Sequence, residues 1–304
     1  MAETKIEWTD FSWNPVTGCE PVSAGCQHCY AARMAKRLAG RNGYPADDPF
    51  RVIVHADRLN EPCHWKKPRR IFVCSMGDLF HEAVPFDFHL QVWDVFRDCP
   101  QHTFLLLTKR PQRMAAATRE IGGYDPEGRM PLSTRYRDFA ENVWLGVSVE
   151  NQVTADERIP WLLKCPAAVR FLSLEPLLGP VDLSVCPNCK GMKTVNESGK
   201  PDGSMEKICG VCLGRGRWEF ARGIHWVIVG PETGPRRRPC DPEWIRSTID
   251  QCAAAGVPVF VKAMEINGEI VKDRERFPRW ANLQKFPADC LLDGREWNEF
   301  SEVK

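Results

Sequence analysis

Three cysteines near the amino terminus have the residue type and spacing of metal ligands. Cys19, Cys26 and Cys29 form a Cys-x6-Cys-x2-Cys loop that leads into AARMAKRLAG (31–40), where apolar residues at helical spacing predict a helix. A closed tetrahedral metal site needs four protein ligands, whereas a catalytic site keeps one position open. Three thiolates on a four-iron cluster would leave one iron free to bind a substrate or cofactor. The alternative is a zinc site completed by His28 or a distant cysteine.

A second set of cysteines lies in a polar segment, 184–222, that is rich in Gly and Lys. It contains two Cys-x-x-Cys knuckles, formed by Cys186, Cys189, Cys209 and Cys212. Four thiolates saturate a tetrahedral Zn²⁺ ion, so this spacing predicts a structural zinc site in a zinc-ribbon-like module. The second knuckle, CGVCLGRG, also resembles the knuckles of DnaJ-type zinc modules. Disulfides or an iron–sulfur cluster are the alternatives.

Small and acidic residues follow several apolar runs of strand length. The carboxyl ends of parallel strands carry the site in a βα barrel, so these residues are site candidates. They are Ser75, Gly77, Asp78, Ser148, Glu150, Ser173, Glu175 and Gly230. For Ser75–Asp78 the alternative is an ordinary turn with a helix cap. For Glu150 and Glu175 it is a salt bridge with Lys109 or Arg110.

The elements that would position these residues alternate between strand and helix. Continuous apolar runs rich in Val, Ile and Phe predict buried parallel strands at 71–76, 103–109, 143–149, 169–174, 225–230 and 257–262. Helical patterns lie at 86–98, 111–120, 151–163 and 241–256. In the last of these, Asp241 is the predicted N-cap, Pro242 the first residue and Gly256 the C-terminal stop. The pattern predicts an α/β fold with a partial or near-complete (βα) barrel, and a doubly wound open sheet is the alternative.

The polar segment interrupts this alternation and so divides the chain. We expect a first part of the barrel with the cysteine loop at 1–183, the zinc module at 184–222, and the barrel remainder with a tail at 223–304. Asp293-Gly294 between short apolar stretches predicts a hairpin in that tail.

Composition limits the class of protein. The 304 residues include 14 cysteines, 43% are apolar, and the net charge is +1, so any nucleic-acid surface must be a local patch. Basic segments at 66–70, 109–113 and 235–239 are candidates for it, and a solvated surface is the alternative. No apolar run approaches the roughly 20 residues that cross a bilayer. The first ten residues lack the apolar core of a signal peptide, so we expect a cytoplasmic protein that contacts no membrane.

The cysteine loop resembles a known family. GCEPVSAGCQHCYA, preceded by WNPVTGC, is similar to the cluster loop of radical SAM enzymes. More narrowly, it resembles a phage-associated family of uncharacterised radical SAM-like proteins of the Gp37/Gp68 type. CSMGDLFH, LLLTKRP, LGVSVEN, FLSLEPLLG and VIVGPETGP share this similarity. The sequence departs from the commonest radical SAM spacing, because the first gap is six residues rather than three and His28 stands where an aromatic residue is usual.

The resemblance implies a cofactor and a chemistry. Cys19, Cys26 and Cys29 would hold a [4Fe–4S] cluster inside a partial barrel of radical SAM type. The open iron would bind S-adenosylmethionine, and one electron from a separate donor would yield a 5′-deoxyadenosyl radical that abstracts hydrogen. The binding residues implied for the methionyl group, the ribose and the adenosine are Ser75, Gly77, Asp78, Ser148, Glu150, Glu175 and Gly230.

Together these features favour a radical SAM-like enzyme that modifies a nucleic acid or nucleotide. One alternative is a zinc-dependent nucleic-acid-binding protein without enzymatic activity. Another is a metal-assisted hydrolase that places Asp78, Glu150 and Glu175 around a divalent ion.

Overall fold

The computed structural model describes residues 4, 6–122, 141–186, 192, 194–195, 207–208, 220 and 223–282. These residues fall into two compact units. Unit 1 takes its described residues from Met1–Val147 and Lys164–Arg170, and unit 2 takes its own from Ser148–Leu163 and Phe171–Cys290. Each unit is described by itself.

The main sheet has the hydrogen-bonded strand order β1-β4-β5-β6-β7-β10-β11. These strands are β1 (Phe11–Trp13), β4 (Arg70–Val73), β5 (Thr103–Thr108), β6 (Val143–Ser148), β7 (Val169–Leu174), β10 (Trp226–Val229) and β11 (Val259–Val261). The pairs β1–β4, β4–β5 and β5–β6 are parallel, as are β7–β10 and β10–β11. A doubly wound sheet reverses its strand order at a switch point, and this order does not reverse. The order is therefore compatible with a partial (βα) barrel and differs from that of the doubly wound alternative.

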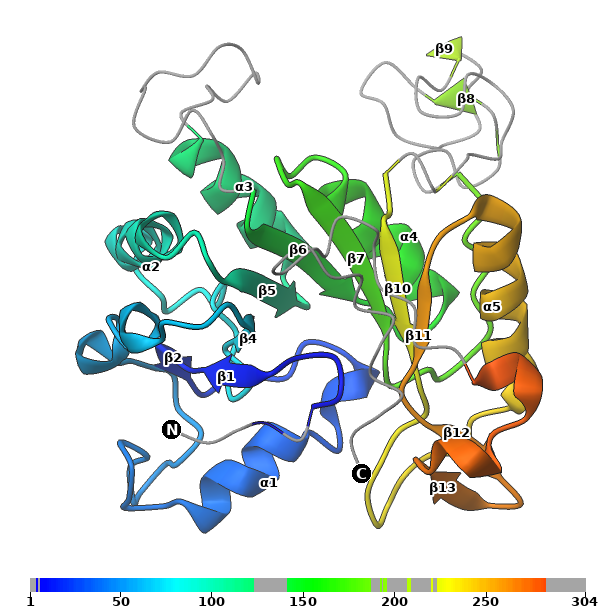
Figure 1. Cartoon of the computed structure of the whole chain (residues 1–304), viewed down its shortest axis with the longest axis horizontal. Coiled ribbons are helices and arrows are strands. Elements are labelled where there is room, and N and C mark those ends of the chain that lie inside the picture. Colours follow the sequence, from blue (N-terminus) through cyan, green and yellow to red (C-terminus); the bar gives the residue numbers. More distant parts are fainter. Residues whose placement is uncertain are drawn as a thin grey trace. The chain divides into compact units, whose positions relative to one another are not determined.

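Unit 1 connects its parallel strands through helices (Figure 1). Helix α2 (Phe86–Asp98) lies between β4 and β5 in the chain, and α3 (Pro111–Ile121) lies between β5 and β6. The two helices contact each other. Helix α1 (Tyr30–Arg37) precedes them, and β2 (Val16–Thr17) pairs antiparallel with β3 (Ile53–Val54). The short 3₁₀ helices η1 (Ala24–Cys26), η2 (Ala56–Arg58) and η3 (Pro62–His64) belong to the same unit.

Aromatic side chains hold α2 against the strands of unit 1. Trp13 of β1, Phe104 of β5, and Trp93 and Phe96 of α2 are all at most 2% exposed. The ring centroids of Phe96 and Phe104 lie 4.5 Å apart, and those of Trp93 and Phe96 lie 5.1 Å apart. Because residues three apart share one face of a helix, Trp93 and Phe96 both reach the core.

Unit 2 contains α4 (Gln152–Leu162) and α5 (Pro242–Ala255), with the 3₁₀ helices η5 (Arg274–Arg276) and η6 (Arg279–Ala281) near its end. The Asn151 side chain accepts from Thr154 N in a capping box that begins α4. The Asp241 carboxylate accepts from Glu243 N at the start of α5, and Gly256, at φ +70°, ends that helix. The predicted ends of α5 at Asp241 and Gly256 are therefore confirmed.

Most of the predicted elements are present, with bounds within three residues. The helix after the cysteine loop is also confirmed, but its apolar stripe is only partly buried. Ala31 and Ala35 are buried, whereas Met34 is 41% exposed. The hairpin of β12 (Met264–Ile266) and β13 (Glu269–Val271) was not predicted. Its turn is Asn267-Gly268, with positive φ at both residues, which is a strong hairpin signal in the sequence.

Two predicted features lie outside the described residues. One is the tail hairpin at Asp293-Gly294. The other is most of the zinc module, including Cys189, Cys209 and Cys212. Within that segment the structure describes an antiparallel pair, β8 (Thr194–Val195) with β9 (Lys207–Ile208).

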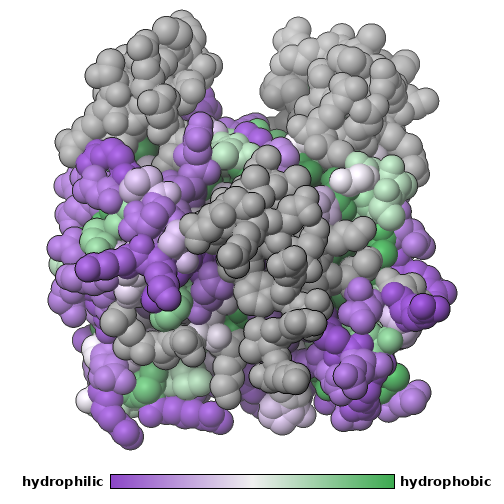
Figure 2. Space-filling model, viewed as in Figure 1, coloured by the Kyte–Doolittle hydropathy of each residue, from purple (hydrophilic) through white to green (hydrophobic). Residues whose placement is uncertain are grey.

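The described surface is mainly polar. Figure 2 shows hydrophilic residues over much of the described part of the face drawn, with smaller apolar areas between them. Among the described helices, none combines the length and the apolar character needed to cross a membrane.

Two cysteines of unit 1 are in sulfur–sulfur contact. Cys63 of η3 is exposed, Cys99 at the end of α2 is buried, and their sulfurs lie 3.1 Å apart. Burial is the main cause that raises the pKa of the Cys99 thiol to about 12. The exposed thiol is therefore the one that an oxidant reaches first.

We expect glutathione disulfide to link this pair. Cys63 would form a mixed disulfide, and the Cys99 sulfur would then displace glutathione as a thiolate. The rate should rise with pH, because the Cys99 thiolate fraction rises with pH up to its pKa. Peptide mapping by mass spectrometry would detect the Cys63–Cys99 link, with Cys63→Ser as the control. Glutathione retained on Cys63 at every pH would contradict the prediction.

Candidate metal centre

The three cysteines of the predicted loop lie at or near the ends of three short elements in succession. Cys19 follows β2, Cys26 ends η1, and Cys29 is the N-cap residue of α1. All three are partly exposed. The backbone winds tightly here, because Cys29 N donates to Cys26 O at 3.2 Å and Arg33 N donates to Cys29 O at 3.3 Å. The prediction that the cysteine loop leads into a helix is confirmed, and the ligand role of its cysteines stays a prediction.

Two glycines bring this loop against the end of β4. Gly18 N donates to Met76 O at 2.9 Å, and Gly18 forms a parallel bridge with Gly77. A Cβ on Gly77 would lie 2.9 Å from Gly18 O and 3.0 Å from Val16 O. Such contacts with backbone atoms are too short, so only glycine fits there. The chain segment that carries Cys19 therefore occupies the space beside Gly77.

Polar contacts tie the segment around Ser75 to its surroundings. The Asn14 side-chain oxygen accepts from Met76 N at 2.8 Å and from Ser75 Oγ at 3.2 Å. The Tyr30 hydroxyl, at the start of α1, donates to Ser75 O. The helix after the cysteine loop is thus joined to the residues that follow β4.

Exposed apolar side chains are concentrated near the cysteines. Among the described residues, six large apolar side chains are exposed. Three of them, Val22, Tyr30 and Met34, lie on the loop or on α1. This surface therefore differs from the mainly polar surface elsewhere.

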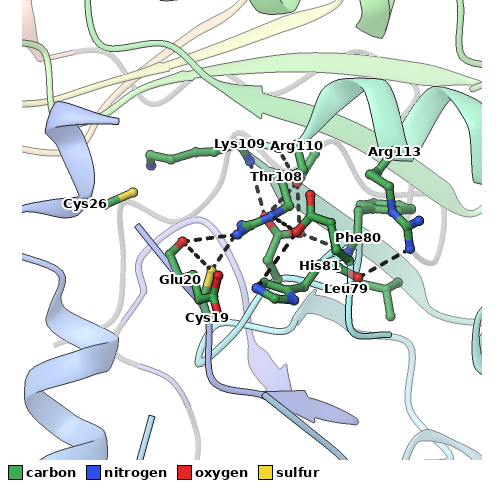
Figure 3. Close-up of polar contacts among 12 residues, drawn as sticks. Cys19, Glu20, Cys26, Leu79, Phe80, His81, Thr108, Lys109, Arg110 and Arg113 are labelled. Atoms are coloured by element: carbon green, nitrogen blue, oxygen red, sulfur yellow. Dashed lines mark hydrogen bonds and ion pairs between the residues drawn. The ribbon is translucent and has the colours of Figure 1, made fainter. Parts of the chain in front are cut away.

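Arg110 contacts the cysteine loop directly, and sequence reasoning had assigned it no role at this site (Figure 3). Its side chain is only 6% exposed. Nη1 donates to Cys19 Sγ at 3.2 Å, and Nη2 donates to Glu20 O at 3.2 Å. Nε donates to Glu82 Oε2 at 2.8 Å, and Nη1 lies 3.5 Å from Asp78 Oδ2. A buried guanidinium therefore has anionic or sulfur partners on several sides.

Asp78 holds Arg110 and the end of β5. Both of its carboxylate oxygens accept from Thr108 Oγ1 at 2.8 Å, and Oδ1 also accepts from Phe80 N at 3.0 Å. Arg110 N donates to the same Thr108 hydroxyl oxygen at 2.9 Å. The carboxylate that the resemblance assigned to a cofactor ammonium group thus has several partners within the protein.

The environment of Cys19 favours the protonated thiol in the absence of metal. Burial raises its pKa to about 11, and the negative charge of Asp78 adds to this effect. The Arg110 guanidinium opposes both effects, and the negative charge of an ionised Cys26 would raise the pKa of Cys19 further. Metal binding at Cys19 would therefore release a proton.

The donor set fits an iron–sulfur cluster by its chemistry. Within the described ranges, no three His, Cys, Asp or Glu side chains are grouped to hold one metal ion. The loop supplies sulfur donors, the ligand type of iron–sulfur clusters, and a guanidinium donates to one of them. In a cluster the thiolates bind different irons, so they need not converge on one point.

In unit 2 the predicted carboxylates are paired with cations. Glu150 lies 3.4 Å from Arg158, and both side chains are at most 2% exposed. Glu175 lies 2.6 Å from Lys262. The hydrolase alternative needs carboxylates available to a divalent ion, and these ion pairs do not favour it.

The remaining candidates of unit 2 lie at strand ends. Ser148 is the last residue of β6, and Ser173 lies next to the last residue of β7. Both side chains are buried. Gly230 follows β10, and its N donates to Leu174 O at 3.1 Å. A Cβ on Gly230 would meet Lys262 Cβ at an ordinary 3.5 Å, so this site does not require glycine for space. Of the four predicted zinc ligands only Cys186 is described, and it is buried.

Arginines of the basic segments mostly contact the protein itself. Arg70 pairs with Asp10 at 3.1 Å, and Arg69 stacks over the Phe11 ring at 3.8 Å. Arg113 donates to His81 O and Val84 O, and Arg238 pairs with Glu232. These contacts, with those of Arg110, give a nucleic-acid surface little support from these arginines.

Comparison with protein families places the chain. A family described as "Protein of unknown function (DUF5131)" matches residues 3–301. The chain belongs to this family. Comparison with curated proteins gave no match, and comparison with solved structures gave none either. Membership of this family carries no activity or cofactor with it.

Replacing the buried carboxylate should affect stability far more than replacing the exposed one. We expect Asp78→Asn to lower the free energy of unfolding by about 3 kcal/mol, because it leaves Arg110 buried without its buried anion. Glu82→Gln removes an anion from the same guanidinium, but Glu82 is 62% exposed, so the loss should stay below about 1 kcal/mol. Urea denaturation of both variants measures the difference, and equal losses would contradict it.

Proposed function

We propose that this member of the DUF5131 family is a radical SAM-like enzyme that holds a [4Fe–4S] cluster through Cys19, Cys26 and Cys29. The observation that carries the proposal is the three-thiol loop, with a buried guanidinium donating to the Cys19 sulfur at 3.2 Å. The parallel strand order of a partial barrel and the residue pattern of the loop support it.

Each part of the site has a separate task under this proposal. The three thiolates would hold three irons and leave one iron for S-adenosylmethionine. The Gly18–Gly77 contact fixes where the Cys19 end of the loop lies, and the Tyr30 contact with Ser75 fixes the Cys29 end. Arg110 supplies positive charge beside a ligand sulfur in a buried setting. When bound, the cluster and S-adenosylmethionine would supply radical chemistry, with the electron coming from a separate donor.

Contacts within the protein argue against two expectations from the sequence, the role of Asp78 and the substrate class. Asp78 accepts from Thr108 and Phe80 and lies beside Arg110, so we propose it as a positioning residue rather than a ligand of the methionyl amino group. The substrate class of nucleic acid or nucleotide depends on loop charge and on the phage association of the family that the sequence resembles. Since several of those arginines have partners within the protein, we propose no substrate class here.

The zinc-ribbon-like module would be a separate folding unit with a structural role. Cys186, Cys189, Cys209 and Cys212 would saturate one Zn²⁺, which leaves no open position for catalysis. Its zinc should therefore be present in protein that lacks the iron cluster.

Cluster binding should depend on the three loop cysteines. After anaerobic reconstitution with iron and sulfide, we expect about four irons per chain and the broad visible absorption of a [4Fe–4S] cluster. Cys26→Ala should lose most of this iron, because one of the three thiolates is removed. Reductant and S-adenosylmethionine should then produce 5′-deoxyadenosine with the wild type alone.

The matched control is Cys63→Ser, which removes an exposed cysteine of the same unit outside the loop. It should retain the iron and the absorption of the wild type. The proposal is wrong if wild type and Cys26→Ala hold equal iron and neither makes 5′-deoxyadenosine. A colourless protein whose loop holds a single zinc ion would favour the zinc-dependent binding protein instead.

A further inference from the structure

We propose that Arg110 is a positioning residue that makes the cluster easier to reduce by donating a hydrogen bond to the Cys19 sulfur. This inference rests on the proposed function, because it concerns a cluster held by the same loop. Under this inference, the reduction equilibrium of the cluster depends on Arg110 as well as on the three cysteines.

The guanidinium is fixed by its contacts. Nη2 donates to Glu20 O at 3.2 Å and Nε donates to Glu82 at 2.8 Å, so the plane of the group is held at two further points. Nη1 is then directed at Cys19 Sγ at 3.2 Å. Figure 3 shows Arg110 reaching from the start of α3 to the loop, and Arg113 pointing elsewhere.

The backbone that carries Arg110 is fixed as well. Arg110 is the N-cap residue of α3, and its N–H donates to Thr108 Oγ1. The Thr108 hydroxyl in turn donates to Asp78. The position of the guanidinium therefore depends on the end of β5 and the turn after β4, rather than on a mobile side chain alone.

The positive charge of the Arg110 guanidinium lies beside the cluster that would accept the electron. Reduction takes one electron from the donor and adds it to the cluster, so negative charge grows on the irons and their sulfur ligands. A positive charge and a hydrogen bond at a ligand sulfur stabilise that reduced form and raise the reduction potential. Burial strengthens the effect, because the local dielectric is lower than that of water. Arginine remains protonated at every pH of interest.

Two acidic side chains limit the effect. Asp78 lies 3.5 Å and Glu82 lies 2.8 Å from the guanidinium, so part of its charge is balanced. The exposed one, Glu82, can be neutralised without touching Cys19. Loss of the positive charge of Arg110 and loss of the negative charge of Glu82 should therefore shift the reduction potential in opposite directions.

The test is a redox titration of reconstituted protein, followed by electron paramagnetic resonance. Arg110→Gln should make reduction at least tenfold less favourable, which for a one-electron couple moves the midpoint by at least 59 mV to more negative values. Arg110→Lys should fall between this variant and the wild type, because it keeps the charge but loses the planar donor geometry. Arg113→Gln, which removes an arginine of the same helix that donates to backbone oxygens, should match the wild type.

Glu82→Gln keeps the inference testable if Arg110→Gln does not fold. It should move the midpoint to less negative values, because a negative partner of Arg110 is lost. Iron per chain is measured for every variant, so that a shift is not confused with loss of the cluster.

The possible failures are distinguishable. If the wild type takes up no cluster, the proposed function fails, and this inference fails with it. If every variant holds a cluster and neither Arg110→Gln nor Glu82→Gln changes the midpoint, the inference is wrong while the proposed function stands. Identical shifts in Arg110→Gln and Arg113→Gln would also overturn it, because any loss of positive charge would then suffice.

Discussion

The buried guanidinium of Arg110 is the interaction on which the candidate site depends. A charge that is 6% exposed is tolerated only if partners replace the water it has lost. Here the partners of the guanidinium come from two places in the chain: the cysteine loop, through Cys19 and Glu20, and the segment after β4, through Asp78 and Glu82. The need to satisfy one cation therefore joins segments that are about 90 residues apart in sequence.

A second constraint is steric and acts on the same loop. The backbone from Val16 to Gly18 passes so close to Gly77 that no Cβ fits between them. Gly18 itself has φ +85°, which a glycine adopts without strain. These two glycines fix the position at which the chain enters the loop, and Arg110 donates to the sulfur of the first loop cysteine, Cys19. Backbone geometry and electrostatics thus act on one residue, Cys19, from two sides.

The elements of the fold were largely predictable because their signals are local. Asn151, Asp241 and Gly256 mark helix ends through contacts within a few residues, and apolar runs mark buried strands. The β12–β13 hairpin has an equally local signal in Asn267-Gly268, where both residues have positive φ. The sequence could not decide between the strand order of a (βα) barrel and that of a doubly wound sheet, because strand pairing depends on contacts between distant segments.

The candidate site was predictable from the sequence only in part. Cysteine spacing identified the loop, because ligands of one site are often close in sequence. The role of Arg110 could not be derived in that way, since its contact with Cys19 spans 91 residues and no spacing rule reports it. The alternative of a salt bridge had linked Arg110 to Glu150 or Glu175, whereas its observed anions are Asp78 and Glu82.

Asp78 illustrates why a motif position does not by itself transfer a role. A carboxylate can bind a cofactor ammonium group only with oxygens that are free to accept. In this chain both oxygens accept from Thr108, and one also accepts from Phe80 N, beside a guanidinium that already supplies positive charge. An added ammonium group would have to reach a carboxylate that is 5% exposed and already has these partners. A carboxylate at this place in the motif is thus better suited to hold Arg110 against the cysteine loop than to bind a ligand itself.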